Sequence, residues 1–270
     1  MLKKLFLVAL FFALSMAEEP AIKPDLKIGN NEIYVISLLE ASVDPDLLVP
    51  ENTSDEQLIE QTYSKDTDPR LYNVVLVKNP DFTMLIDTGL SSTTSKLKAE
   101  LKKRGVKPDQ ITQVAVSHGH PDHIGGLGEA GATFANATLL INEAEYKYWM
   151  KRGDEKTKKR LNMYKNRLSF YMNGENLVTK NSNIKPIFVP GHTPGMTIFN
   201  FNDEFYDIAD MIYAFDVQIG RPEIAHIYDI DKKSAMAERK KILEIFKKNP
   251  NIKVIGTHFP YSEPEPLKVP

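Results

Sequence analysis

Apolar and β-branched positions form short runs along residues 73–258, and these runs alternate with amphipathic segments. Short apolar runs bounded by Gly, Pro, Asn or Asp are typical of strands, whereas apolar positions three or four apart predict helices. The predicted strands lie in residues 73–87 (two strands joined by a turn at residues 79–81), 111–118, 137–142, 184–192, 197–210 (a hairpin that turns at residues 202–203) and 252–258. The predicted helices lie in residues 91–105, 145–172 (two segments that break near residue 153) and 229–250.

Residues 18–70 have a different character, because they are rich in Pro, Asp and Glu. We expect irregular structure there, apart from one short helix over residues 54–63 that begins at Ser54. The strands of the rest of the chain come in two runs with helices between them, which predicts two packed sheets flanked by helices. No repeat or low-complexity linker divides the sequence, so residues 18–270 are predicted to form one domain.

The first residues have the pattern of an export signal. Lys3 and Lys4 precede an apolar run over residues 5–14, and small residues follow up to Ala17. A basic start, a short apolar core and a small-residue cleavage point are typical of a secretory signal peptide, which we assign to residues 1–17. The alternative is an uncleaved anchor, although the run is short for spanning a bilayer. We expect a periplasmic or secreted protein with no stable membrane anchor after cleavage.

Charge and cysteine content narrow the classes of function. The formal net charge is −2, so no broad positive field points to nucleic acid. We therefore expect a small-molecule substrate, and the sequence leaves open whether the chain forms a homodimer. The chain contains no cysteine, which excludes disulfides and a lipoprotein anchor.

A dense histidine cluster is the strongest chemical signal in the chain. Three of the six histidines lie in residues 117–126, SHGHPDHIGG, directly after a predicted strand. His118 and His120 alternate along an extended segment, so both can face one metal ion. Asp122 and His123 lie where the strand turns and are better placed for a second ion nearby. Imidazole and carboxylate ligands suit zinc and similar first-row ions.

Two metal ions need more ligands than these four residues supply. His192 (in PGHTPG), Asp210 (in YDIAD) and His258 (in VIGTHFP) each come just after a predicted strand or at its end. Four separate strand ends therefore carry residues of the kind that bind metals. His226 has no such setting, and we do not expect it to be a ligand.

These motifs, in this order, resemble the metallo-β-lactamase fold superfamily. The resemblance covers residues 73–260 and includes Asp87 in LIDTG, which is similar to the first motif of that superfamily. It implies an α/β fold, a four-layer αββα sandwich with the site at one edge of the two sheets. The resemblance assigns His118, His120 and His192 to a first metal, Asp122, His123 and His258 to a second, and Asp210 to a bridge between them. It gives Asp87 the task of orienting ligands.

Two divalent ions, for which zinc is our first expectation, would hold a hydroxide that attacks an ester-like bond. Asp122 can also pass a proton to the leaving group. Iron, manganese and cobalt remain open as native metals, because histidine and carboxylate sites accept them too.

Within the superfamily, the chain most resembles the N-acyl homoserine lactonase and methyl parathion hydrolase-like branch. Tyr213 follows Asp210 by three residues, as a tyrosine does in those lactonases, where its hydroxyl can donate to the lactone carbonyl. A tyrosine that only packs beside the site is the alternative. The segments 221–243 and 256–261, with an Asp-x-Asp run that opens a helix, resemble the methyl parathion hydrolase-like enzymes. We therefore predict an exported dinuclear hydrolase that acts on lactones, and on phosphotriesters as a second class.

Two other functions remain open. SHGHPDH and export also suit a β-lactamase-type amide hydrolase, although the all-histidine members generally lack the aspartate that Asp210 provides. A non-enzymatic metal-binding module is the third alternative, and the full ligand set argues against it. The aromatic and Met-rich residues of 145–172 are read as helices packed on the core, with a substrate lid as the minority alternative.

Overall fold

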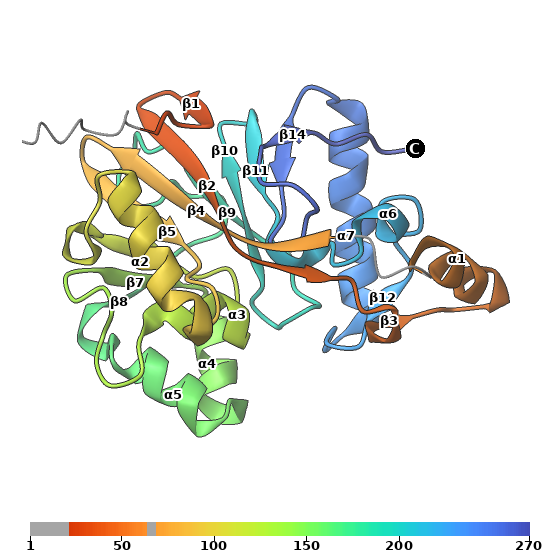
Figure 1. Ribbon diagram of the computed structural model, residues 1–270, viewed down its shortest axis with the longest axis horizontal. Helices are drawn as coiled ribbons and strands as arrows, with labels where there is room; N and C mark the ends of the chain where they lie inside the picture. The colour runs from red at the N-terminus through yellow and green to blue at the C-terminus, as the bar shows by residue number, and fades with distance from the viewer. Residues whose placement is uncertain (1–21, 64–68) are drawn as a thin grey trace, which may run out of the picture.

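Two β-sheets face each other, and helices cover their outer sides (Figure 1). The computed structural model describes residues 22–63 and 69–270, so the predicted signal peptide lies outside the described residues. The strands are β1 (Leu26–Ile28), β2 (Asn31–Ser42), β3 (Leu48–Val49), β4 (Pro69–Asn79), β5 (Phe82–Ile86), β6 (Gln113–Ala115), β7 (Thr138–Ile141), β8 (Leu168–Phe170), β9 (Ile184–Phe188), β10 (Thr197–Phe201), β11 (Phe205–Asp207), β12 (Ala225–His226), β13 (Lys253–Ile255) and β14 (Glu265–Pro266). The helices are α1 (Thr53–Tyr63), α2 (Thr94–Lys103), α3 (Pro121–Ile124), α4 (Glu143–Arg152), α5 (Glu155–Asn162), α6 (Phe215–Gln218) and α7 (Lys232–Lys248).

The larger sheet has the strand order β1-β2-β4-β5-β6-β7-β8, and the smaller sheet has the order β14-β13-β11-β10-β9. A short pair, β12 with β3, lies beside them. In Figure 1, α2, α4 and α5 lie outside the larger sheet and α7 lies outside the smaller one. This confirms the predicted αββα sandwich. Within the described residues, no helix combines the length and the apolar character needed to cross a bilayer.

The larger sheet is buried on both faces. Along β2, Ile33 and Val35 join the core between the two sheets, whereas Tyr34 and Ile36 join the core beneath the outer helices. Leu97 of α2 belongs to that second core. Because side chains alternate across a strand, burial of both faces requires apolar residues at nearly every position.

This double burial explains the main error of the sequence interpretation. The prediction of irregular structure over residues 18–70 is wrong, because β2 spans twelve residues of that stretch. Its apolar run shows no period of two, and the many acidic and proline residues around it hid the strand. The short helix predicted over residues 54–63 is confirmed as α1, which begins one residue earlier.

Other element predictions are confirmed with small changes. The β10–β11 hairpin turns at Asn202 and Asp203, which both adopt positive φ. Helix α7 is capped by Asp231, whose side chain accepts a hydrogen bond from Ser234 N. Gly153 separates α4 from α5 as predicted. Residues 168–170 are not helical, however, because they pair with β7 as the edge strand β8.

The directions of four strands bring the predicted ligands to one edge. Strands β9 and β11 both pair antiparallel with β10, so they run the same way, and β13 runs parallel to β11. The chain leaves β9, β11 and β13 toward His192, Asp210 and His258, and it leaves β6 of the other sheet toward His118. The sandwich therefore gathers these side chains at a single place.

Candidate metal centre

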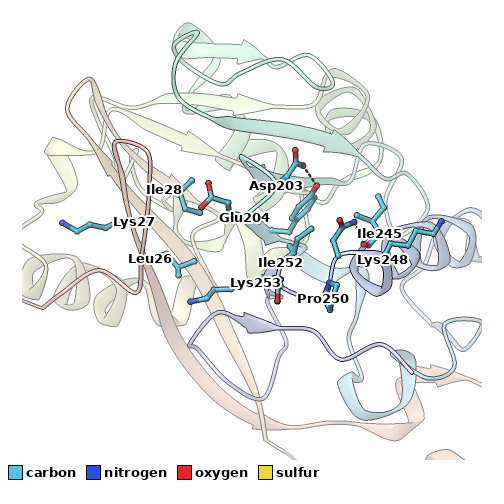
Figure 2. A pocket seen from close by; sticks show the side chains of 13 residues that line it. Leu26, Lys27, Ile28, Asp203, Glu204, Ile245, Lys248, Pro250, Ile252 and Lys253 are labelled. Atoms are coloured by element: carbon cyan, nitrogen blue, oxygen red, sulfur yellow. Dashed lines mark hydrogen bonds between the residues drawn. The ribbon is translucent and has the colours of Figure 1, made fainter.

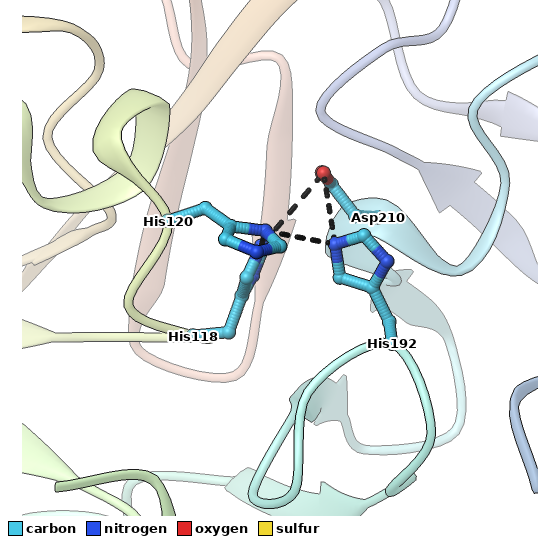
Figure 3. Close-up of side chains that lie close together, drawn as sticks. All are labelled: His118, His120, His192 and Asp210. Carbon is cyan, nitrogen blue, oxygen red and sulfur yellow. Dashed lines mark hydrogen bonds and ion pairs between the residues drawn. The ribbon is translucent and has the colours of Figure 1, made fainter. Parts of the chain in front are cut away.

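Three histidine nitrogens converge where β6 and β9 end (Figure 3). His118 Nε2 lies 2.9 Å from His120 Nδ1, and His192 Nε2 lies 3.0 Å from that same nitrogen. At most one of these contacts can be a hydrogen bond at a time, because His120 Nδ1 has either one proton or one lone pair. Such spacing instead suits nitrogens that share one cation, which sit about 3 Å apart around an ion 2.0–2.1 Å away.

A second group forms beside the first. Helix α3 begins at Pro121, and its first turn carries Asp122 and His123. His258 Nε2 lies 3.3 Å from Asp122 Oδ2, and His123 Nε2 lies 3.6 Å from the same oxygen. These three residues and Asp210 form the second set that could hold a metal ion.

Asp210 belongs to both groups. Its Oδ1 lies 3.2 Å from His123 Nε2, and its Oδ2 lies 3.4 Å from His258 Nε2 in the second group. The same Oδ2 lies 3.6 Å from His192 Nε2 and 3.8 Å from His118 Nε2 in the first. The structure thus brings together all seven residues that the resemblance proposed as ligands.

The orientation of the imidazoles fits a metal centre. In four of the five histidines of the cluster, Nδ1 faces an acceptor, which assigns a proton to Nδ1 and leaves Nε2 as the nitrogen that can bind a cation. The acceptors are Ser117 Oγ for His118, Asp87 Oδ2 for His123, Asp229 Oδ1 for His192 and the Leu71 carbonyl for His258. In addition, His123 Nε2 and Asp210 Oδ1 are buried and have no hydrogen-bond partner among the described atoms. These residues fit a bound cation.

Charge also prepares the cluster for metal. Burial, helped by neighbouring His192, lowers the pKa of His120 to about 3, so its ring is neutral and able to bind a cation at neutral pH. Burial lowers the pKa of His258 as well, but the Asp210 and Asp122 carboxylates outweigh it and raise the value to about 9. A cation that binds at His258 therefore displaces a proton.

The position of Asp87 fits the orienting role that the resemblance implies. It follows β5 with φ of 58°, a backbone conformation that is uncommon for a residue other than glycine. Its Oδ2 is 2.7 Å from His123 Nδ1 and accepts a hydrogen bond from Ser117 Oγ at 2.5 Å. Ser117 Oγ in turn faces His118 Nδ1 at 3.1 Å. One carboxylate therefore orients a histidine of each group.

The sequence analysis missed two buried carboxylates. Asp229, the first residue of the helix predicted over residues 229–250, lies 2.9 Å from His192 Nδ1 and also accepts from His226 N at 3.0 Å. Two aspartates, Asp229 and Asp231, precede α7, and Asp231 is the one that caps the helix. Nothing local marks an aspartate whose partner is 37 residues away in sequence.

Glu145 is the second missed carboxylate, and it joins the two histidine loops. It is fully buried on α4. One oxygen accepts from Gly119 N at 2.8 Å and from the Trp149 indole, and the other accepts from Thr193 Oγ1 and Gly195 N, each at 2.8 Å. Burial raises its pKa, and the four donors oppose that effect.

A cavity of about 340 Å³ opens over the cluster. Its lining includes Tyr213, whose hydroxyl accepts a hydrogen bond from Asp44 N at 3.2 Å. It also includes His226, whose ring packs against that of Tyr213 with the centres 4.2 Å apart and the planes tilted by 35°. His226 belongs to neither ligand group, as expected. Burial lowers its pKa to about 4, so the ring is neutral.

The segment 145–172 contributes no residue to the lining of this cavity. Trp149, Met150 and Met163 pack against the core beneath the outer helices, and Tyr164 is fully buried there. The packing interpretation therefore holds for these residues, whereas Phe170 and Met172 of the same segment are exposed and line no part of this cavity.

A larger cavity, about 770 Å³, lies elsewhere (Figure 2). It sits between β1, the β10–β11 turn and the end of α7, and its lining holds no histidine. The candidate metal site lies at the smaller cavity, because residues of the histidine–aspartate cluster line that cavity and none of them lines the larger one.

Comparison with known proteins agrees with this geometry. The family described as the Metallo-beta-lactamase superfamily matches residues 67–258. The chain belongs to the metallo-beta-lactamase superfamily. Metallo-beta-lactamase domain-containing protein 1 of Xenopus laevis is 30% identical over 105 residues, which is 37% of this chain and 42% of that protein. The rat protein of the same name is 42% identical over 59 residues, 22% of each chain. These alignments span less than half of the curated relatives.

Solved structures of superfamily members superpose over most of the chain. AidC, described as a dizinc quorum-quenching lactonase, is 25% identical with a TM-score of 0.75, covering 88% of this chain and 91% of its own. The hydrolase AbOPH is also 25% identical with a TM-score of 0.74, covering 92% and 93%. The fold and these neighbours confirm the resemblance to the superfamily and to its lactonase branch.

Proposed function

We propose that the chain is an exported dinuclear metal-dependent hydrolase that opens lactones, with phosphotriesters as a second class of substrate. The observation that carries this proposal is the position of Asp210, whose carboxylate belongs to both ligand groups. A shared aspartate suits two ions about 3.5–4 Å apart, the spacing of two-metal hydrolytic sites. The likeness to AidC, a dizinc lactonase, supports a lactone as the substrate.

In this proposal the first ion is held by His118, His120 and His192, the second by Asp122, His123 and His258, and both by Asp210. When bound, two divalent ions, for which zinc is the first candidate, lower the pKa of water and polarise an ester carbonyl, which is the chemistry that hydrolysis requires. Asp87 and Asp229 keep the imidazoles in the tautomer and direction that this requires.

Two residues of the cavity act on the substrate. Burial raises the pKa of the Asp122 carboxyl, but His123 and His258 outweigh it and hold the pKa below its usual range, so the group lines the cavity as a carboxylate. It would take a proton from the attacking water and pass that proton to the leaving group. The Tyr213 hydroxyl accepts from Asp44 N, which leaves its own proton free to donate to the carbonyl oxygen as negative charge develops there. The Tyr213 ring packs against the His226 ring, so the Tyr213 hydroxyl is held in place before the substrate arrives.

A panel of N-acyl homoserine lactones tests the function. We expect zinc-loaded protein to open the ring, chelation to abolish the activity, and added zinc to restore it. His120→Ala is the control, because it removes a ligand nitrogen of the first group. Absence of ring opening above that control would overturn the lactone assignment. Nitrocefin turnover that survives Asp210→Ala would favour the β-lactamase-type alternative.

Export is tested separately from catalysis. We propose that residues 1–17 are removed and that residues 18–270 act as one domain outside the cytoplasm. The intact mass of protein recovered from the periplasm or medium should correspond to a chain that begins at Glu18. Recovery of a chain that keeps residues 1–17 contradicts the signal peptide. Light scattering on the same material tests the homodimer.

A further inference from the structure

Arg70 places a positive charge in the cavity above the metal cluster. Its side chain lines the same cavity as His120, Asp122 and His258, and it comes from the first residues of β4. Four other arginines with buried or partly buried side chains are paired with carboxylates, namely Arg104, Arg160, Arg221 and Arg239. Arg167 is the exception among the described residues, because it donates to the Ala137 carbonyl and packs on Tyr164, away from the cavity. Within residues 22–63 and 69–270, Arg70 has a tyrosine hydroxyl as its polar partner and no carboxylate.

Two tyrosines hold the Arg70 guanidinium in place. Its Nη2 donates to Tyr72 Oη at 2.7 Å, and its central carbon lies 4.5 Å from the Tyr213 ring centre and 5.2 Å from that of Tyr72. The Tyr72 ring in turn packs edge-on against the ligand histidine His258 at 4.8 Å. Aromatic rings orient a guanidinium, but they do not neutralise it. The charge is therefore directed toward the cavity, and no carboxylate of the described part of the chain forms an ion pair with it.

This arrangement leaves donors for a bound molecule. A guanidinium has five N–H groups, and one of them is used by Tyr72. Two divalent ions would bring four positive charges, of which Asp122 and Asp210 balance two, so Arg70 adds to a positive excess. A plain alkyl lactone gains nothing from that charge, whereas a planar or tetrahedral anion gains charge-assisted hydrogen bonds.

We propose that Arg70 is the specificity-determining residue of the cavity and that the preferred substrate is an ester or lactone that also carries an anionic oxygen group, a carboxylate or a phosphate, whereas neutral lactones and phosphotriesters are turned over less efficiently. This inference rests on the proposed function, because it concerns the same cavity. Arg70 binds the anionic group while the scissile bond lies over the cluster. The closing experiment therefore measures anion binding as well as turnover.

Three esters that share the p-nitrophenolate leaving group separate the effect of substrate charge from the effect of the reacting bond. They are p-nitrophenyl butyrate, which is neutral, mono-p-nitrophenyl glutarate, which carries a carboxylate, and p-nitrophenyl 3-phosphonopropanoate, which carries a phosphonate as a phosphate analogue. The zinc-loaded protein should prefer one or both anionic esters by kcat/KM, mainly through a lower KM. Whichever anionic ester is preferred identifies the anion. In Arg70→Met the ratio of anionic to neutral kcat/KM should fall about 10- to 100-fold, as expected for loss of a charged hydrogen bond.

Arg70→Lys and Arg167→Met complete the set. Lysine keeps the charge but loses the paired donors, so the ratio should fall to an intermediate value. Arg167 also packs on a tyrosine, at 5.7 Å from the Tyr164 ring, but it lies outside the cavity, so its variant should keep the wild-type ratio. Equal losses on neutral and anionic esters in Arg70→Met would overturn the proposal, and so would a ratio near one in the wild type.

Calorimetry of glutarate and of phosphonopropanoate binding to zinc-loaded protein gives a readout that does not depend on turnover. Binding of the preferred anion should weaken about 10- to 100-fold in Arg70→Met. If no ester is cleaved and the lactone panel also shows no ring opening, the proposed function fails, yet the calorimetry still decides the role of Arg70. If Arg70→Met does not fold, Arg70→Lys decides by the same measurement. Anion binding that is unchanged in the folded variant would refute the role of Arg70.

Discussion

Replacement of Glu145 by glutamine tests whether the buried carboxylate fastens the two histidine loops together. Gly119 lies between His118 and His120, and Gly195 follows His192 by three residues, so each loop carries ligands of the first group. Glu145 is the one side chain of α4 that contacts both loops through hydrogen bonds among the described residues. Loss of its charge should loosen the loops and weaken metal binding.

The size of the effect follows from the four donors. In Glu145→Gln, the amide nitrogen fits best in place of the oxygen that faces Thr193, because that hydroxyl can rotate and accept. Gly195 N–H then loses its acceptor, which costs about 1–3 kcal/mol. The remaining bonds lose the strength that a charged acceptor gives them, while the cost of burying a carboxylate disappears. We expect a net loss of about 2–3 kcal/mol in the free energy of unfolding.

Urea unfolding and chelator competition measure the two consequences. Zinc affinity of Glu145→Gln should fall about 10- to 100-fold, the usual effect of losing a residue that supports ligands. Glu143→Gln is the matched control, because Glu143 begins the same helix and forms an exposed ion pair with Lys147 at 2.9 Å. If Glu145→Gln keeps wild-type stability and zinc affinity, or behaves like the control, the reasoning is refuted.

Three further substitutions test other contacts of the site. In Asp229→Asn, zinc affinity measured by chelator competition should fall about tenfold, because the amide group cannot accept from both His192 Nδ1 and His226 N; unchanged affinity would contradict this. Burial holds the pKa of His226 near 4 in the folded state, against about 6.5 unfolded, so its contribution to stability is present above pH 6.5 and is lost as pH falls toward 4. Phenylalanine does not titrate, so between pH 6.5 and pH 4 the free energy of unfolding of His226→Phe should fall less than that of the wild type, by on the order of 3 kcal/mol. Parallel curves of unfolding free energy against pH for the two proteins would refute this prediction. In Tyr213→Phe, kcat for lactones should fall about 100-fold with little change in KM if its hydroxyl donates to the developing oxyanion, and an unchanged kcat would leave Tyr213 a packing residue.

The sequence by itself determined the chemistry of the cluster and most of the elements around it. His118, His120, Asp122 and His123 lie within six residues, so their proximity is local and can be read from spacing. His192, Asp210 and His258 could be proposed because each follows an apolar run, and strand ends of a layered fold meet at one edge. Turn residues and helix caps are local signals too, which is why the hairpins and α7 were predicted correctly.

Only the tertiary structure decided the contacts that join distant segments. Strand β2 is apolar on both faces because cores lie on both sides of it, and a pattern of period two does not arise in such a strand. Asp229, Glu145 and Arg70 carry no local signature, since acidic and basic residues before or within a helix or strand are usually solvated. The partners that connect them to the site, His192 for Asp229, Thr193 and Gly195 for Glu145 and Tyr213 for Arg70, lie tens of residues away. The folded chain alone therefore places a buried carboxylate behind His192 or a guanidinium over the cluster. Sequence spacing reports what one strand or helix can do, whereas the packing of several elements decides which polar groups lose water and so must find partners.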